Sequence, residues 1–389
     1  MKILFVHNAY QHFGGEDAVV NAEMDLLRAH GHAVDLYLRN NDELKQLSSA
    51  VAATTVIWSR QAARHIRSLC DSFRPDLIHV HNTFALISPS VYWVAAQKNI
   101  PVVQTLHNYR LLCPQGTFLR KGSICQDCLG KAPWRAVGRK CYRQSAPQSA
   151  VMAGMLGAHR AAGTYRDRVT RYIALTAFAR DRFIQGGLPA EKLRVKPNFV
   201  DVPVQPAWEA RRGGLFVGRL SEEKGTGTLA GAARLLANAD IDVIGSGPDE
   251  AAVRAQFGPR CHGFLPREAI LARMRAASFL IVPSICHEQL PTTLIEAFSC
   301  GLPVIASRLG ALADLVEDGV TGLLFEPGDA AGLASKIAWA QTHGAELERM
   351  GRAARARYEA TYTPSINYNM LVRIYEDAMA ERDGRRHAP

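Results

Sequence analysis

Features typical of membrane proteins, repeat arrays and secreted proteins are missing from this chain of 389 residues. No run approaches the roughly 20 apolar residues that a membrane-spanning helix needs. We find no internal repeat and no low-complexity tract, which leaves ordinary globular domains as the expectation. The opening stretch, MKILFVHNAY, lacks the apolar core and the small-residue cleavage site of a signal peptide. We therefore expect a cytosolic protein.

The length and composition of the chain indicate two domains, and its charge is unevenly distributed. A chain of 389 residues, 48% of them hydrophobic, is long enough for two well-packed domains. Residues 1–200 hold 26 Lys and Arg against 13 Asp and Glu, whereas residues 201–389 hold 20 against 23. This basic first half indicates an anionic partner: nucleic acid, acidic lipid or a phosphate-bearing acceptor. Solubility alone is the alternative explanation.

The rest of the chain is organised around residues 281–310, which read as strand, loop, helix and strand. After a Pro that suits a first turn, Thr292 and Thr293 begin the helix and offer hydroxyls to cap it. Unpaired N–H groups at a helix start favour a phosphate. Glu288 precedes that start and Glu296 follows one turn inside, so both carboxylates should face hydroxyl-rich groups beside a diphosphate. A nucleotide sugar has that shape, whereas two ordinary exposed Glu residues are the alternative.

The same stretch resembles a family signature: Glu288, seven residues, Glu296, Ala297-Phe298, and then CGLPVIA over residues 300–306. It is similar to that of the family 4 retaining glycosyltransferases, nucleotide-sugar enzymes of the GT-B fold. Many members have Gly-Phe-Gly after the first Glu, where this chain has Gln-Leu-Pro at 289–291. The resemblance implies an α/β protein with two Rossmann-like domains facing each other across a cleft. It further implies a C-terminal helix that crosses back to the first domain.

The resemblance also divides the chain. We expect an N-terminal, acceptor-binding domain over residues 1–200, completed by the C-terminal helix 365–381. A Cys-rich insertion occupies residues 109–143 of that domain. Residues 201–364 form the C-terminal domain that binds the nucleotide sugar. The oligomeric state is not readable from the sequence.

A second motif lies where the C-terminal domain begins. Residues 218–225 read GRLSEEKG, a Gly turn after a strand with two cations flanking a helix start. Arg219 can chelate phosphate oxygens and Lys224 adds a point charge. This matches the GRL-x-x-x-KG pattern with which the family binds diphosphate. By the same resemblance, Gly245 forms a further turn beside the nucleotide, and Phe264 lies near the base.

The N-terminal domain offers its candidates after two strands. Strand 2–7 leads into Gly14 and Gly15 and then a helix, a ligand-binding arrangement whose spacing is not that of a dinucleotide site. In the family this loop lies near the donor diphosphate and the acceptor; a plain tight turn is the alternative. His107 directly follows the carboxyl end of strand 101–106, and parallel sheets bind ligands at that end. The resemblance implies that His107 orients the donor sugar, whereas a core or capping His is the alternative.

Two other features of the first half have less specific readings. His79 and His81 share one side of a strand, but no third metal ligand is evident beside them, and packing is the favoured interpretation. Residues 51–68 are expected to form one helix with Trp58 and basic residues. It suits either a solvated face or contact with anionic lipid. A further single helix is expected over residues 149–166.

Four cysteines with the spacing C-x11-C-x2-C-x12-C mark the insertion: Cys113, Cys125, Cys128 and Cys141. The segment lacks sustained apolar periodicity, so it cannot bury much of a core. Four thiolates on one structural Zn²⁺ would supply order, because metal binding becomes folding free energy. Reduced thiols without metal, and redox chemistry, are the alternatives. The position after the His107 strand suggests that the insertion lines the acceptor side.

These readings combine into one predicted reaction. A sugar moves, with retention, from a UDP- or GDP-sugar to a saccharide or polyprenyl-diphosphate-linked acceptor in surface polysaccharide assembly. The two cations and the helix start stabilise the leaving diphosphate without a catalytic divalent metal. Glu288 holds donor-sugar hydroxyls and Glu296 holds the ribose. The basic half predicts a peripheral position at the inner face of an anionic membrane. The paired Glu residues and the diphosphate motif argue against a nucleic-acid partner.

Two other functions compete with it. A GT-B sugar-nucleotide epimerase would turn over the donor with no acceptor. A non-enzymatic, zinc-containing nucleic-acid binder would use the basic half and show salt-steep binding. The paired Glu residues and the diphosphate motif favour the transferase, because a binder has no use for them.

Overall fold

The fold is described from a computed structural model, which describes residues 1–11, 14–201, 206–208 and 210–386. The chain divides into two compact units. Unit 1 comprises residues 1–116, 126–197 and 367–389, and unit 2 comprises residues 117–125 and 198–366. We expected the whole Cys-rich insertion to belong with the N-terminal part, but residues 117–125 group with unit 2 instead.

Unit 1 is built on a six-stranded parallel sheet. Its strand order is β2 (Ala33–Asn40), β1 (Lys2–Ala9), β3 (Leu77–Asn82), β4 (Val102–Leu106), β7 (Arg171–Ala174) and β8 (Leu193–Val195). The central strands β3 and β4 are buried along their whole length. Continuous apolar runs of this kind belong to parallel sheets that are covered on both faces.

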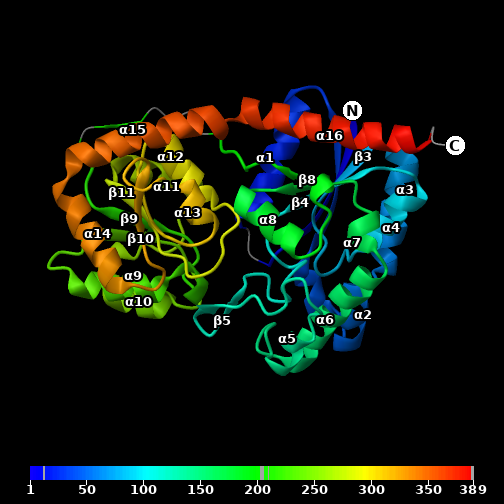
Figure 1. Ribbon diagram of the computed structural model, residues 1–389, viewed down its shortest axis with the longest axis horizontal. Helices are drawn as coiled ribbons and strands as arrows, with labels where there is room; N and C mark the ends of the chain where they lie inside the picture. The colour runs from blue at the N-terminus through cyan, green and yellow to red at the C-terminus, as the bar shows by residue number, and fades with distance from the viewer. Residues whose placement is uncertain (12–13, 202–205, 209, 387–389) are drawn as a thin grey trace. The chain divides into compact units, whose positions relative to one another are not determined.

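Helices pack beside the unit 1 sheet and on one another (Figure 1). They are α1 (Gly15–Ala29), α2 (Ser49–Ile57), α3 (Arg60–Phe73), α4 (Ser90–Gln97), α5 (Arg135–Gly138), α6 (Ala146–Ala161), α7 (Thr164–Asp167), α8 (Ala177–Gln185) and α16 (Pro364–Arg386). The last helix completes the core, since Leu371, Ile374 and Tyr375 pack with Ile3 and Phe5 of β1. A segment from the end of the chain therefore closes one face of a sheet that begins at its start.

Two helices predicted as single are each broken in the structure. The stretch 51–68 divides at Trp58, which is extended, and Ser59, whose side chain accepts a hydrogen bond from Ala62 N and caps α3. The stretch 149–166 divides at Gly163, whose φ of 66° ends one helix before the next begins. The apolar residues recur at helical spacing through both stretches, but the Ser59 cap and the left-handed backbone of Gly163 each separate two helices.

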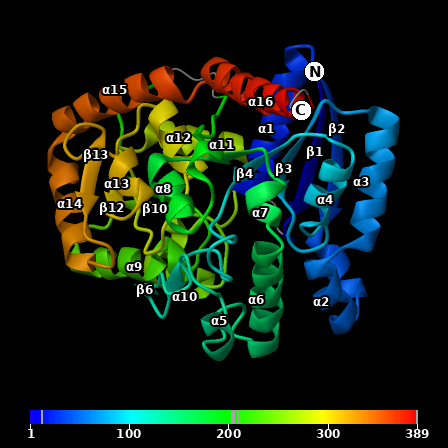
Figure 2. The same cartoon turned by 45° about the vertical axis from the view of Figure 1, so that its right-hand side comes forward.

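Unit 2 contains a second parallel sheet, of five strands. Its order is β10 (Ile241–Ile244), β9 (Gly214–Val217), β11 (Phe279–Val282), β12 (Val304–Ser307) and β13 (Gly322–Phe325). The accompanying helices are α9 (Thr226–Leu235), α10 (Glu250–Phe257), α11 (Arg267–Ala276), α12 (Thr292–Ser299), α13 (Ala311–Leu315), α14 (Ala330–Thr342) and α15 (Gly344–Thr361). In Figure 2, α14 and α15 lie beside β13. Each unit is thus a Rossmann-like layer of parallel strands with helices.

Residues 117–125 carry a short antiparallel hairpin, β5 (Leu119–Arg120) and β6 (Ser123–Ile124). The backbone around the hairpin uses positive φ at Phe118, Lys121 and Gly122. Over the residues that are described, no helix has both the length and the apolar character that crossing a bilayer requires.

Candidate functional site

The candidate site of unit 2 begins where β9 and β11, neighbours in the sheet, end. The loop after β9 carries Lys224, and the loop after β11 carries Glu288. Gly225 has φ +75°, and a Cβ there would lie 1.8 Å from the Pro283 carbonyl oxygen. Only glycine allows that backbone approach. This close packing holds the two loops together.

Lys224 and Glu288 form the centre of this site. The Lys224 Nζ donates to Glu288 Oε1 at 2.7 Å, and the Ser284 hydroxyl donates to the same oxygen at 2.7 Å. The Lys224 side chain is 31% exposed and that of Glu288 is 12% exposed. Burial lowers the pKa of Lys224, but attraction to Glu288 outweighs it and raises the pKa overall. Lys224 is therefore a cation that solvent can still reach.

Glu296 lies inside α12 and pairs with a residue that the sequence did not reveal. Arg267 Nε donates to Glu296 Oε1 at 3.0 Å; the Glu296 side chain is 12% exposed and that of Arg267 is 52% exposed. Burial raises the pKa of Glu296, and Arg267 opposes part of that rise. Arg267 lies at the start of α11, 29 residues from Glu296 in the sequence, so no local motif predicts the pair.

The start of α12 differs from the predicted cap. Pro291 occupies the N-cap position, and within the described ranges no side-chain hydrogen bond caps this helix, so the hydroxyls of Thr292 and Thr293 do not serve as caps. Gln289, just before it, is 6% exposed, and neither polar atom of its amide has a hydrogen-bond partner among the described residues. A buried amide without partners is costly, so the loop holds polar groups that a ligand could satisfy.

The remaining unit 2 candidates occupy exposed or glycine-dependent positions. Arg219 is exposed in the loop after β9. Gly245 has φ +144°, and a Cβ there would lie 1.8 Å from the Gly218 carbonyl oxygen. The Gly245 N–H donates to Gly263 O at 2.8 Å, which places the neighbouring Phe264 near this turn. The Phe264 side chain is 78% exposed, so a large aromatic face is open to solvent.

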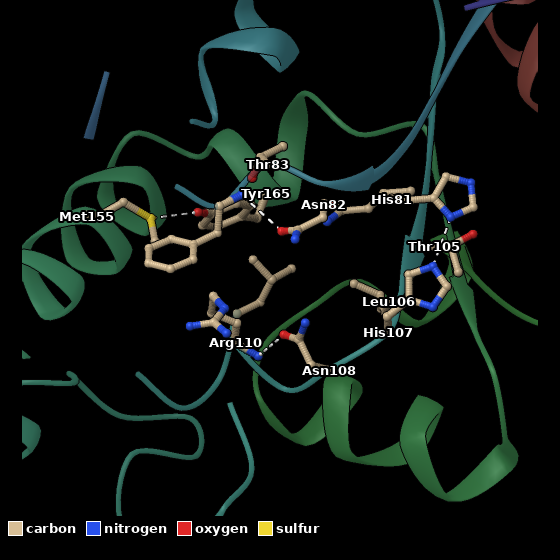
Figure 3. Close-up of a pocket in the computed structure, with 13 residues that line it drawn as sticks. His81, Asn82, Thr83, Thr105, Leu106, His107, Asn108, Arg110, Met155 and Tyr165 are labelled. Carbon is tan, nitrogen blue, oxygen red and sulfur yellow. Dashed lines mark hydrogen bonds between the residues drawn. The ribbon is translucent and has the colours of Figure 1, made fainter. Parts of the chain in front are cut away.

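Unit 1 has its own pocket, at the carboxyl end of β4 and around His107 (Figure 3). Its lining includes His81 and Asn82 from β3, His107 and Asn108 after β4, and Arg110. His107 Nε2 lies 2.8 Å from His81 Nδ1, a hydrogen bond drawn in Figure 3. Burial, with the nearby His7 and Lys196 charges, lowers the pKa of His107 to about 3. His107 is therefore neutral over the whole physiological range.

A buried polar cluster lies behind His107. It contains Glu23 of α1, His79 and His81 of β3 and Lys196 after β8, and all four side chains are fully buried. We expected no third metal ligand near the two His residues, but Glu23 supplies a carboxylate within 4.8 Å of their ring nitrogens. Glu23 was missed because it is far from β3 in sequence and interrupts an otherwise ordinary amphipathic helix.

A second acidic group lies at the start of α1. His7 Nε2 is 2.8 Å from Asp17 Oδ1, and the Gly14 N–H donates to Asp17 Oδ2 at 2.8 Å. Burial, and then repulsion from Asp17, raise the pKa of Glu16 to about 8. Gly15 is the first residue of α1. The sequence predicted the Gly loop, but it did not predict that carboxylates would surround it.

The four insertion cysteines stay a predicted metal site. None of the eight cysteines, all within the described ranges, forms a disulfide. Cys113, Cys128 and Cys141 belong to unit 1, and Cys125 belongs to unit 2. The one group of three or more clustered metal-ligand side chains found among the described residues is that of Glu23, His79 and His81.

Comparison with family models identifies both halves of the chain. Residues 13–203 match a model described as Glycosyltransferase Family 4, and residues 211–343 match a model described as Glycosyl transferases group 1.

Three curated relatives illustrate the sequence similarity. The 2-deoxystreptamine glucosyltransferase of Streptomyces kanamyceticus is 30% identical over 300 residues, which is 72% of each chain. The amylovoran biosynthesis glycosyltransferase AmsK of Erwinia amylovora is 30% identical over 216 residues, 50% of this chain and 53% of the relative. A 2-deoxystreptamine N-acetyl-D-glucosaminyltransferase of Niallia circulans is 29% identical over 43% of this chain and 45% of the relative. The chain thus spans about half the length of the last two.

Solved structures agree on the fold. The sucrose-phosphate synthase of Thermosynechococcus elongatus matches with a TM-score of 0.74 at 18% identity, over 98% of this chain and 99% of that one. The Anabaena protein HepE, in complex with UDP and glucose, matches with a TM-score of 0.70 at 18% identity, over 97% of this chain and all of that one. At this identity the likeness establishes the fold, which is GT-B.

Proposed function

The chain belongs to glycosyltransferase family 4, and from this premise we propose that it is a retaining hexosyltransferase that uses a nucleotide-diphosphate sugar. The observation that carries the proposal is the contact between Lys224 and Glu288, 2.7 Å apart at the ends of neighbouring strands. A cation for a diphosphate and a carboxylate for sugar hydroxyls stand side by side there. Nucleotide-sugar chemistry needs both.

In the proposed reaction, the bond between the anomeric carbon and the diphosphate oxygen breaks, and an acceptor hydroxyl oxygen bonds to that carbon. The nucleoside diphosphate leaves with the bonding electrons, and the acceptor proton passes to the departing diphosphate oxygen or to water. Arg219, Lys224 and the start of α12 stabilise the negative charge that grows on the diphosphate. These groups carry that role without an obligatory divalent metal.

The other unit 2 residues fix the donor. Glu288 accepts hydrogen bonds from donor-sugar hydroxyls, which it can do while Ser284 and Lys224 hold its carboxylate in place. Glu296 accepts hydrogen bonds from the ribose, and the exposed ring of Phe264 is suited to contact the base. Gln289 supplies a further polar contact, supported by the lack of partners for its buried amide among the described residues. Gly245 lets the backbone approach the nucleotide.

In unit 1, we assign His107 to the donor sugar and the loop of Gly14 and Gly15 to the diphosphate and acceptor. His107 acts as a neutral hydrogen-bonding group, because its low pKa excludes an imidazolium at neutral pH. The acceptor is a saccharide or a lipid-linked saccharide, in keeping with the polysaccharide role in the name of the Erwinia relative. UDP- and GDP-sugars are the donor candidates, and HepE was crystallised with UDP.

A thermal-shift panel of UDP-, GDP- and ADP-sugars tests the donor proposal. A ligand that binds only the folded state stabilises it by about 2.7 kcal/mol at 100 times Kd. We expect one nucleotide class to raise the melting temperature of the wild type and to lose this effect in Glu296→Ala. The matched control, Glu268→Ala, removes an exposed carboxylate beside Arg267 and should respond like the wild type. No shift with any donor, or an equal shift in both variants, would contradict the donor site.

Association with an anionic membrane is a separate part of the proposal. It is supported by the net positive charge of residues 1–200 and by Trp134, which is 57% exposed near several basic residues. Vesicle sedimentation tests it: binding should increase with the anionic lipid fraction and fall with added salt. Binding that ignores both would refute it.

A structural Zn²⁺ on Cys113, Cys125, Cys128 and Cys141 also stays a proposal. The donor set suits zinc, since thiolates are its preferred ligands, and no disulfide removes them among the described residues. Each Cys→Ser change should lower zinc content and melting temperature together. A metal-free preparation with full stability would rule the ion out.

The two competing functions gain no support from the relatives described above, which are named as glycosyltransferases. An epimerase would convert the donor with no acceptor present. A nucleic-acid binder would not respond to Glu296→Ala in the donor panel.

A further inference from the structure

The buried cluster behind the unit 1 pocket connects directly to His107. We propose that Glu23 and Lys196 are positioning residues which, through His81, fix the proton of His107 on Nε2. His107 then offers Nδ1 to its substrate as a hydrogen-bond acceptor. The inference rests on the proposed function only in assigning His107 to the donor sugar.

The first step is the orientation of Glu23. Lys196 Nζ donates to Glu23 Oε1 at 2.7 Å and to Asn367 Oδ1 at 2.9 Å, and none of these three residues is exposed. The Asn367 amide in turn donates to the Pro197 carbonyl at 2.6 Å. These contacts fix which carboxylate oxygen faces Lys196. The other oxygen, Oε2, is left facing β3.

The second step is the proton on His81. Glu23 Oε2 lies 3.5 Å from His81 Nε2, and neither atom has a hydrogen-bond partner elsewhere in the described residues. A ring nitrogen lone pair facing a carboxylate oxygen would be repelled, whereas an N–H is attracted. For side chains that are fully buried this difference is large, because the charges are poorly screened at low dielectric. His81 therefore carries its proton on Nε2.

The third step is the proton on His107, which lines the pocket. With its proton on Nε2, His81 has a lone pair on Nδ1, which lies 2.8 Å from His107 Nε2. The hydrogen bond between them then requires a proton on His107 Nε2 (Figure 3). A neutral ring with that proton has its lone pair on Nδ1. A sugar hydroxyl can donate to this nitrogen.

A divalent cation held by Glu23, His79 and His81 is the competing explanation of the cluster. The contacts oppose it. The Lys196 ammonium is 2.7 Å from the same carboxylate and would repel a metal ion. Both ring nitrogens of His79 are already used, by the Tyr375 hydroxyl at 2.7 Å and the Thr105 hydroxyl at 2.8 Å.

The test is to locate the protons by NMR of the full chain with ¹⁵N-labelled histidine, without any substrate. Protonated and unprotonated ring nitrogens have well-separated shifts, and a His107→Gln variant assigns the signals. We expect Nε2–H and an unprotonated Nδ1 for His107. In Glu23→Gln, Lys196 keeps the amide oxygen, so the amide NH₂ faces His81 Nε2. Both histidine tautomers should then reverse, leaving His107 with its proton on Nδ1.

The matched control is Tyr375→Phe, which removes another buried hydrogen bond from the same cluster but not from the path to His107. It should lower the melting temperature by an amount similar to Glu23→Gln and retain the wild-type His107 signals. Sugar transfer by Glu23→Gln should show kcat reduced at least tenfold, with the affinity for nucleoside diphosphate unchanged.

Three results would overturn the inference: a wild-type His107 protonated on Nδ1, unchanged tautomers in Glu23→Gln, or a stoichiometric divalent ion lost in Glu23→Gln. The wild-type spectrum still tests the tautomer of His107 if Glu23→Gln fails to fold. It also decides if no sugar transfer is found, so failure of the proposed function is seen separately.

Discussion

The candidate sites of the two units use charge in opposite ways. In unit 2, Lys224 and Glu288 keep their charges near solvent, with side chains 31% and 12% exposed. In unit 1, Glu23 and Lys196 are fully buried, and the group that reaches the pocket is the neutral ring of His107. A charged diphosphate needs charges that it can reach, whereas a ring that must keep one tautomer needs buried charges that no solvent can screen.

Removing the Lys224 cation of unit 2 should have the largest effect on sugar transfer. In Lys224→Met the leaving diphosphate loses a charge partner, so sugar transfer should fall by two to three orders of magnitude. Initial rates of nucleoside diphosphate release measure this. Lys336→Met, on α14 of the same unit, is the control and should retain the wild-type rate. A loss under threefold in Lys224→Met would mean that the diphosphate is stabilised elsewhere.

A pH series on Glu16→Gln tests the buried acid of unit 1. The folded pKa of Glu16, about 8, lies above its usual 4.5, so the folded state binds more protons than the unfolded state between those values. Stability is therefore full below about pH 4.5 and is lost as the pH rises through 8. Wild type should lose on the order of 3 kcal/mol relative to Glu16→Gln between pH 5 and 8. Denaturant unfolding measures the difference.

Two parallel pH curves in that series would show that Glu16 is not held protonated. Glu359→Gln, which changes a 57% exposed carboxylate on α15, is the control and should follow the wild type.

Gln289→Met should change the folding stability and the donor affinity of unit 2 in opposite directions. The amide of Gln289 is buried without partners among the described residues, so an apolar side chain of similar size should stabilise the chain by about 1–3 kcal/mol. The same change should weaken donor binding about tenfold if the ligand uses that amide. Melting temperature and calorimetric titration report the two effects. A less stable variant would show that the amide is satisfied inside the protein, and unchanged donor binding would show that the donor does not use it.

Arg267→Ala should have the smallest effect. The Arg267 side chain is 52% exposed, and a pair of this kind contributes about 0.2–1 kcal/mol. Donor affinity should therefore change by less than about fivefold, in contrast to Glu296→Ala. A loss as large as that of Glu296→Ala would make Arg267 a direct ligand of the donor.

Local patterns in the sequence predicted much of the fold and named the candidate residues of unit 2. The strand 279–282 and the helix 292–299 were readable because buried runs, Pro and Gly mark their ends. Two separate motifs named Lys224 and Glu288, and the parallel sheet places those motifs after neighbouring strands, but the contact between the two side chains was not predicted. What could not be predicted joins distant segments: Arg267 with Glu296, and Glu23 with Lys196, lie 29 and 173 residues apart. Nothing local distinguishes such side chains from those of an ordinary helix face.

The division between the two units is tested most directly by titrating a free nucleoside diphosphate, with no sugar attached, into three proteins. These are the wild type, Glu296→Ala and His107→Ala, each with UDP, GDP and ADP in a calorimeter. The account predicts that one diphosphate binds the wild type and His107→Ala equally well and binds Glu296→Ala at least tenfold more weakly. Weakened binding in His107→Ala with normal binding in Glu296→Ala would place the nucleotide in unit 1 and contradict the account.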